Sequence, residues 1–362
     1  MKDGHNPKLR FGVTLSEVRD STFRSGIANA PPLPIVNYAL VGKQAPSLPT
    51  TPVGRLPKVS TVVITWADAE WAALEHVFCA GSDTMPYGDR SRSMWAGWEK
   101  YSQNLPSGRP SNWTYWGYYR LVEIGQEAVL LFKSNTHLDW PGPTYLRALI
   151  KLLAAEAKPG AILSIGTAGG AKPQDHIGTV RAVSAGTLFE RGQPQVDWPE
   201  YSNGWKAREA TLANADFKRL LLPVPTKMSD LQALCSQFNG HYGTDYTLAQ
   251  LDPNQLNLGE ATPRIDDETG GEVSLLTTPT FAVGTTAGNY QTFTSIEMDD
   301  AVVGETCASN GIAFGFVRNI SDPVQSEALP AKVQGNWGSA VYDTYGFYTS
   351  YNGAIATWAM LA

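Results

Sequence analysis

The feature that most constrains the fold is a series of short, continuous apolar runs, each placed beside a segment of helical spacing. Val59–Thr65, Ala161–Ile165 and Ile312–Val317 have the composition of strands that are buried on both faces. The stretch from Pro143 to Leu153 has its apolar residues at the spacing of a buried helix face, and Asp299–Ser309 predicts another helix. Such alternation predicts an α/β fold, in which a single-domain three-layer αβα arrangement surrounds a central mixed β-sheet.

The remaining length divides into an arm and two insertions. Residues 1–57 are rich in proline and lack periodicity, so we expect an extended N-terminal arm. One domain then covers residues 58–362, with insertions at 79–119 and 190–275. The first insertion is aromatic, and its side chains are expected to serve packing or a subunit interface rather than stacking on single-stranded nucleic acid.

Composition excludes several classes of protein. The chain has 28 basic and 34 acidic side chains, a net charge of −6, which argues against a nucleic-acid-binding surface. Its 3 cysteines form no CxxC pair and its 5 histidines no HxH or HxxxH pair, so we expect no disulfide framework and no metal site. The sequence contains neither an apolar leader segment nor a membrane-spanning run, and it predicts a cytoplasmic protein.

A glycine-rich segment follows the apolar run Ala161–Ile165. Gly166-Thr167-Ala168-Gly169-Gly170 matches neither the dinucleotide nor the Walker phosphate motif. Glycines at the carboxyl end of a strand let a ligand approach the backbone, where open α/β sheets bind their ligands. A plain tight turn explains the same residues equally well.

Three groups of acids are candidates for chemistry. Glu297-Met298-Asp299-Asp300 precedes a helix, where acids complement the helix dipole or hold the hydroxyls of a sugar. Asp322 ends an apolar strand and is either a loop residue or a general acid with a raised pKa. Glu70 begins the first helix and either complements its dipole or activates a water molecule.

The order of these motifs resembles the nucleoside phosphorylase/nucleosidase superfamily, which includes purine and uridine phosphorylases and methylthioadenosine/S-adenosylhomocysteine nucleosidases. The matching blocks run from about residue 60 to the C-terminus. They include TVVITWADAEWAAL, KPGAILSIGTAGGA and, most specifically, SIEMDDAVVGETCASNGIAFGFVRNISD, in which an acid-Met-acid helix start is followed by R-x-x-S-D.

The resemblance implies a role for each matching residue. Glu70 would activate the attacking water, and Asp322 would protonate the leaving base with support from Arg318 and Ser321. Asp299 takes the place of a ribose-binding glutamate and is one methylene shorter. The other residues that would bind substrate are Thr167, Ala168, Gly169, Thr286, Tyr290, Glu297 and Met298.

The resemblance also implies the reaction, the cleavage of an N-glycosidic bond in a purine or related nucleoside without a cofactor, by a homo-oligomer that is a dimer or a hexamer. The hexameric phosphorylases carry arginines around the first strand–helix loop and before the glycine segment. Here these positions are Trp66–Ala69 and Ser164-Ile165. Because phosphate binding favours arginine, the sequence favours hydrolysis. A phosphorylase and a nucleoside-binding protein without catalysis stay open as alternatives.

Overall fold

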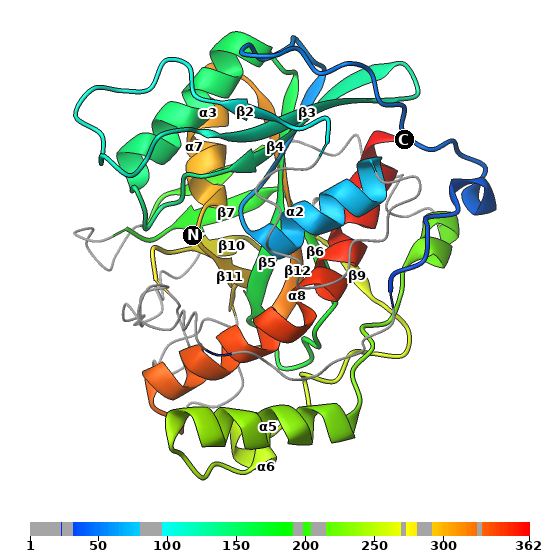
Figure 1. Cartoon of the computed structure of the whole chain (residues 1–362), viewed down its shortest axis with the longest axis vertical. Helices are drawn as coiled ribbons and strands as arrows, with labels where there is room; N and C mark the ends of the chain where they lie inside the picture. The colour runs from blue at the N-terminus through cyan, green and yellow to red at the C-terminus, as the bar shows by residue number, and fades with distance from the viewer. Residues whose placement is uncertain are drawn as a thin grey trace, which may run out of the picture.

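A computed structural model describes the fold of residues 23, 32–79, 96–190, 198–203, 215–268, 273–280, 292–323 and 328–362. Its strands form one mixed sheet in the order β2-β3-β4-β1-β5-β11-β10-β7-β8, while β12 pairs with β5 and β6, and β6 with β9 (Figure 1). The strands are β1 Thr61–Thr65, β2 Glu99–Tyr101, β3 Gly117–Ile124, β4 Glu127–Ser134, β5 Ala161–Gly170, β6 Val180–Val183, β7 Ala185–Leu188, β8 Glu200–Ser202, β9 Ile265–Glu268, β10 Leu275–Thr277, β11 Ser295–Glu297 and β12 Ala313–Pro323.

Helices cover both faces of this sheet. The helices and helical turns are η1 Tyr38–Val41, α2 Asp68–Leu74, the π-turn η2 Glu75–Cys79, α3 Pro143–Ala157, η3 Ala215–Leu220, α5 Met228–Tyr242, α6 Leu248–Leu251, α7 Asp300–Asn310 and α8 Ala331–Leu361. The predicted mixed α/β fold, with a central sheet flanked by helices, is confirmed.

The two helical layers follow from the alternation of side chains along each strand. In β1, Val63 packs into the cluster that α2 and α8 cover, whereas Val62 and Ile64 pack into the cluster that α3 and α7 cover. The predicted helix stripe at Leu146, Leu149, Ile150 and Leu153 is fully buried in the second cluster. Each such side chain contributes about 1.5–3 kcal/mol when it leaves water.

The glycine segment is part of a strand, and the turn interpretation is wrong. β5 continues to Gly170 because β12 pairs along its whole length and β11 pairs with its last two residues. The glycines instead let neighbouring side chains lie close to the backbone of β5. A Cβ at Gly166 would lie 2.9 Å from Glu70 Oε1 and would collide with the guanidinium of Arg318.

The C-terminal helix begins earlier than the amphipathic pattern from Thr349 indicates. α8 runs from Ala331 to Leu361, and polar residues such as Asn336 and Thr344 are buried in its first half. Burial of polar and glycine residues removes the apolar periodicity on which the prediction depends.

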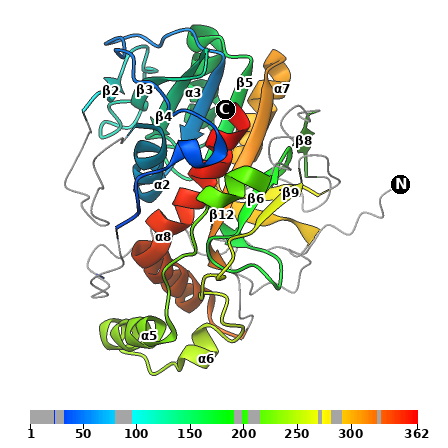
Figure 2. The same ribbon diagram turned by 90° about the vertical axis from the view of Figure 1, so that its right-hand side faces the viewer.

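Residues 32–57 lie along the domain. Leu33, Val36 and Tyr38 pack into the cluster under α2 and α8, and Ser47 bridges to Glu123 of β3. Five aromatic residues between 96 and 119 are core residues, namely Trp98, Tyr101, Trp113, Trp116 and Tyr119. α5 and α6, from the second insertion, lie beside the first turns of α8, where Phe238 contacts Trp337 (Figure 2).

Candidate active site

Three of the predicted motifs meet at the carboxyl end of β5. Gly169 has Ile296 of β11 as its partner on one side and Asp322 of β12 on the other. β12 contains a bulge between Ile320 and Asp322, which shifts the register as the strand reaches the site. Ala168 is buried, and Gly169 is partly exposed. The sheet therefore brings the start of α7 and the predicted general acid to opposite sides of one strand end.

Glu70 is a fully hydrogen-bonded carboxylate. It lies at the third position of α2 and reaches back to the N–H of the N-cap residue, Ala67, as in half of a capping box. Its Oε2 accepts hydrogen bonds from Thr65 Oγ1 at 2.9 Å and from the N–H groups of Trp66 and Ala67 at 2.8 Å. Its Oε1 accepts from Thr167 N at 2.6 Å and from Thr167 Oγ1 at 2.8 Å.

These contacts keep Glu70 ionised. Burial by itself would raise its pKa, but the positive charge of Arg318 and the hydrogen bonds from Thr167 and Ala67 outweigh burial and hold the pKa below its ordinary value. A carboxylate offers about four lone-pair directions, so the donors of the chain use all of them.

Arg318 is surrounded by acceptors from three elements. Its guanidinium makes a two-pronged contact with Asp300, lies 3.0 Å from Glu297 Oε2, and donates to Ser164 Oγ at 3.3 Å and to Thr167 O at 3.2 Å. Asp322 is not among these partners, and it lies four positions further along β12 than Arg318, so the structure does not bring the two side chains together. Asp300, which has no role in the sequence prediction, is the main partner of Arg318.

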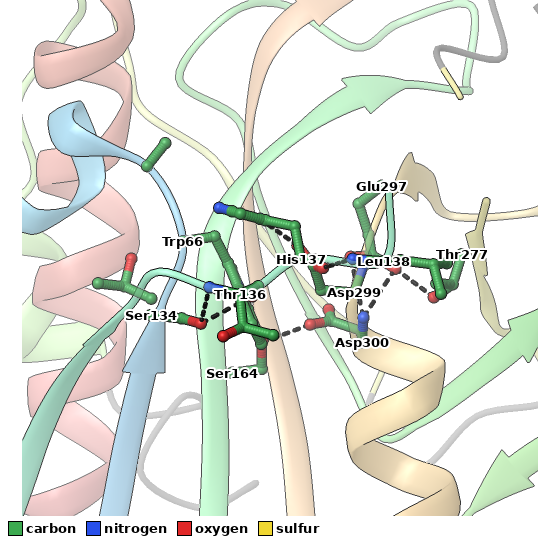
Figure 3. Close-up of polar contacts among 12 residues, drawn as sticks. Trp66, Ser134, Thr136, His137, Leu138, Ser164, Thr277, Glu297, Asp299 and Asp300 are labelled. Carbon is green, nitrogen blue, oxygen red and sulfur yellow. Dashed lines mark hydrogen bonds and ion pairs between the residues drawn. The ribbon is translucent and has the colours of Figure 1, made fainter. Parts of the chain in front are cut away.

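Glu297 organises the start of α7. Its carboxylate accepts from the N–H of Asp299 at 2.6 Å, from the N–H of Asp300 at 3.0 Å, and from Thr277 Oγ1 (Figure 3). Burial and the neighbouring Asp300 raise the pKa of Glu297 to about 8, although Arg318 opposes the shift. Two buried carboxylates share one arginine here, so the pair favours an additional proton.

Asp299 is held from the loop that follows β4. Its Oδ2 lies 3.2 Å from His137 Nδ1, and its Oδ1 accepts from the N–H of Leu138 at 3.0 Å (Figure 3). Met298 beside it is half-buried. The contact of His137 with Asp299 joins residues 162 positions apart, which no local pattern reveals.

Asp322 has the opposite environment to Glu70. Its Oδ1 accepts a hydrogen bond of 2.5 Å from Ser321 Oγ. A Cβ at Gly338 of α8 would lie 3.3 Å from its Oδ2, so the helix backbone packs directly against the carboxyl group. Burial raises the pKa of Asp322 to about 6, and the Ser321 bond only partly offsets this shift.

Thr286 and Tyr290 lie outside the described residues. Within the described ranges, no cluster of histidine, cysteine or acidic side chains has the arrangement of a metal site. Over the same residues, no helix combines the length and apolar character that crossing a bilayer requires.

Comparison with known proteins gives structural neighbours but no sequence relatives. No family model matches the chain, and no curated protein matches its sequence. A structure from Borrelia burgdorferi, described as a 5′-methylthioadenosine/S-adenosylhomocysteine nucleosidase bound to adenine, is similar with a TM-score of 0.50 and 13% identity, over 83% of this chain and 98% of that one.

Two further structures have TM-scores of 0.44. The 5′-methylthioadenosine/S-adenosylhomocysteine nucleosidase of Neisseria meningitidis is 12% identical and is matched over 84% of this chain and 99% of that one. Futalosine hydrolase of Helicobacter pylori is 11% identical and is matched over 84% and 97% of the two chains.

The chain therefore has the α/β fold of the Borrelia burgdorferi structure. That structure is a member of the nucleoside phosphorylase/nucleosidase superfamily, so the resemblance that the motifs indicate is confirmed at the level of the fold. At these identities the likeness extends to the fold alone, and the roles of individual residues depend on the geometry of the site.

Proposed function

We propose that this protein is a nucleosidase that hydrolyses the N-glycosidic bond of a purine or related nucleoside. The observation that carries this proposal is the position of Asp322, a carboxyl group with a pKa near 6 at the carboxyl end of the sheet, across Gly169 from the start of α7. In this proposal Met298 and Asp299 lie on the sugar side and Asp322 on the base side.

Asp322 supplies the proton for the leaving base. Cleavage of an N-glycosidic bond leaves negative charge on the base, and proton donation from a positioned acid accelerates such a step by about 10²–10⁴-fold. A carboxyl group with a pKa near 6 is protonated in part of the molecules at neutral pH, whereas an ordinary aspartate is not. Ser321 keeps the carboxyl group oriented.

The nucleophile in this proposal is water. The N–H groups of Trp66, Ala67 and Thr167 converge as an anion-binding site would, but they already hold the carboxylate of Glu70. The guanidinium of Arg318 is likewise occupied by Asp300 and Glu297. A phosphate in this position would face a fixed negative charge, and this arrangement favours hydrolysis over phosphorolysis.

Thr167 connects the water to Glu70. Because the acceptor directions of Glu70 are filled, we infer that the water donates its proton to Thr167 Oγ1 while that hydroxyl passes its own proton to Glu70 Oε1. Thr167 is half-buried, as a contact between the interior and a bound substrate requires. The ionised Glu70 also stabilises the positive charge that develops on the sugar.

Release of free base from a panel of purine and pyrimidine nucleosides tests the proposal, with phosphate added or left out. We expect release without phosphate. Strict dependence on phosphate would assign the protein to the phosphorylases, and binding without any release would make it a nucleoside-binding protein. The homo-oligomer and the cytoplasmic location stay predictions from the sequence.

A further inference from the structure

The loop between β4 and α3 presents one histidine to the candidate sugar site. His137 lies in this loop, which is fixed by the bond from His137 N to Trp140 O at 2.8 Å and by the bond from Ser134 Oγ to Thr136 O at 2.7 Å. None of the residues of the proposed mechanism comes from this loop.

His137 and Asp299 form a pair in which the carboxylate is buried and the imidazole is partly exposed. The side chain of Asp299 is 4% exposed and both of its oxygens bond to the loop, whereas the side chain of His137 is 27% exposed. The carboxylate is therefore enclosed by the loop and directed at the ring. Whatever Asp299 contributes to substrate binding has to pass through the imidazole.

The ring is fixed on two sides. The carboxylate holds Nδ1, and the ring of Trp66 lies against it with centroids 5.8 Å apart. Trp66 is itself anchored by a bond of 2.9 Å from Nε1 to Ser164 Oγ (Figure 3). Within the described residues no group bonds to Nε2, which lies on the other side of the ring from the bonded nitrogen.

The charged groups around His137 favour a proton on Nδ1. Burial lowers the pKa of His137 and Lys133 lowers it further, but Asp299, the N-cap residue of α7, and Asp139 from the same loop outweigh them, so that the pKa lies above its ordinary value. With Nδ1–H donated to Asp299, Nε2 accepts a hydrogen bond in the neutral ring and donates one in the protonated ring. Either form pairs with a hydroxyl group.

We propose that His137, oriented by Asp299, binds the vicinal hydroxyls of the sugar and makes the site select ribonucleosides over deoxynucleosides. This inference rests on the proposed function, since it concerns the sugar side of the same site. Both oxygens of Asp299 are bonded to the loop, and the imidazole offers Nε2 as the hydrogen-bonding atom beside it. A hydrogen-bonding site rejects ligands that lack the matching group because its own polar atoms are then left unpaired.

Equilibrium binding of uncleavable nucleosides tests the inference independently of catalysis. The probes are C-nucleosides, in which carbon replaces the glycosidic nitrogen, in ribo, 2′-deoxy and 3′-deoxy forms, measured by titration calorimetry. We expect the unmodified protein to bind the ribo form at least about tenfold more tightly than one of the deoxy forms. His137→Phe keeps a ring against Trp66, and His137→Ala removes it; both variants should bind the three forms within about threefold of one another.

The control is His241→Gln, at an exposed histidine on α5, which should leave the discrimination unchanged. Discrimination that persists in both His137 variants would overturn the inference, and so would equal binding of all three forms by the unmodified protein. Base release from ordinary nucleosides, measured on the same preparations, reports on the proposed function separately. A protein that releases base but does not discriminate would retain its function and lose this role for His137.

Discussion

Glu70 and Asp322 are two carboxyl groups at one end of the same sheet, and their surroundings differ. Glu70 accepts hydrogen bonds from Thr65, Trp66, Ala67 and Thr167 and lies in the field of Arg318. Asp322 accepts one from its neighbour Ser321, while the backbone of α8 packs against it. Burial acts on both, yet the pKa of Glu70 is lowered and that of Asp322 is raised to about 6.

Burial alone does not decide whether a carboxyl group in this site is ionised or protonated. The number of hydrogen-bond donors and the nearest charge decide whether the ionised or the protonated form of a buried carboxyl group is favoured. When the surroundings shift the pKa values of two carboxyl groups apart, one group can act as the acid while the other is ionised at the same pH. In this protein Asp322 holds the proton that the base needs, and Glu70 is ionised before the reaction and so can accept the proton of the water.

The largest effect is expected from Asp322→Asn, which removes the proton donor and preserves the shape of the side chain. We expect kcat for base release to fall by about 10²–10⁴-fold with little change in nucleoside affinity. Steady-state kinetics and calorimetric binding measure the two quantities. Asp267→Asn, at an exposed acid on β9, is the matched control and should keep kcat within about twofold.

The dependence of turnover on pH tests the same role of Asp322. Asp322 acts while protonated, so turnover of the unmodified protein should be full below pH 6 and should decline as the pH rises through about 6. The residual turnover of Asp322→Asn should lack this decline. A decline of the same size in both proteins would assign the titrating group elsewhere.

Glu70→Gln should lower stability as well as turnover, since the amide cannot accept the proton that Thr167 passes on. The amide keeps one acceptor oxygen, but its NH₂ group has to face N–H donors of the chain. The attraction between the carboxylate and the positive charge of Arg318 is also lost. We expect the free energy of unfolding at pH 7 to fall by about 2–4 kcal/mol in denaturant titrations. Asp68→Asn, at an exposed acid in the first turn of α2, is the control and should change it by less than about 0.5 kcal/mol.

The sign of the pH dependence separates this role from that of Asp322. Because the folded state lowers the pKa of Glu70, its stabilisation is present above the ordinary glutamate pKa and is lost as the pH falls through the lowered value. The stability difference between Glu70→Gln and the unmodified protein should therefore shrink in acid. A difference that grows in acid would contradict an ionised Glu70.

Much of the fold could be predicted because the strands are locally encoded. The apolar runs of β1, β5 and β12 and the stripe of α3 each fall in the chain where the pattern indicates. The first half of α8 could not be predicted, since its buried residues are polar or small. The strand character of Gly166–Gly170 comes from pairing with β11 and β12, which are distant in sequence.

The site could be predicted only as a set of residues. The motifs indicated Glu70, Asp299 and Asp322, and the sheet brings their elements to the end of β5. Their partners could not be inferred, because the pairs of Arg318 with Asp300 and of His137 with Asp299 depend on side chains that meet only after folding. Sequence spacing locates candidate chemistry, while contacts across the sheet set the charge of each group.

The smallest change in turnover is expected at Thr167, whose hydroxyl lies between Glu70 and the proposed position of the water. Thr167→Val keeps the shape and the N–H bond to Glu70 but removes the hydroxyl, so kcat should fall about tenfold, the value of one hydrogen bond in the transition state. Thr167→Ser restores a hydroxyl at the same atom and should keep kcat within about threefold. Rates that do not distinguish Val from Ser would exclude the relay and leave Glu70 with a purely electrostatic role.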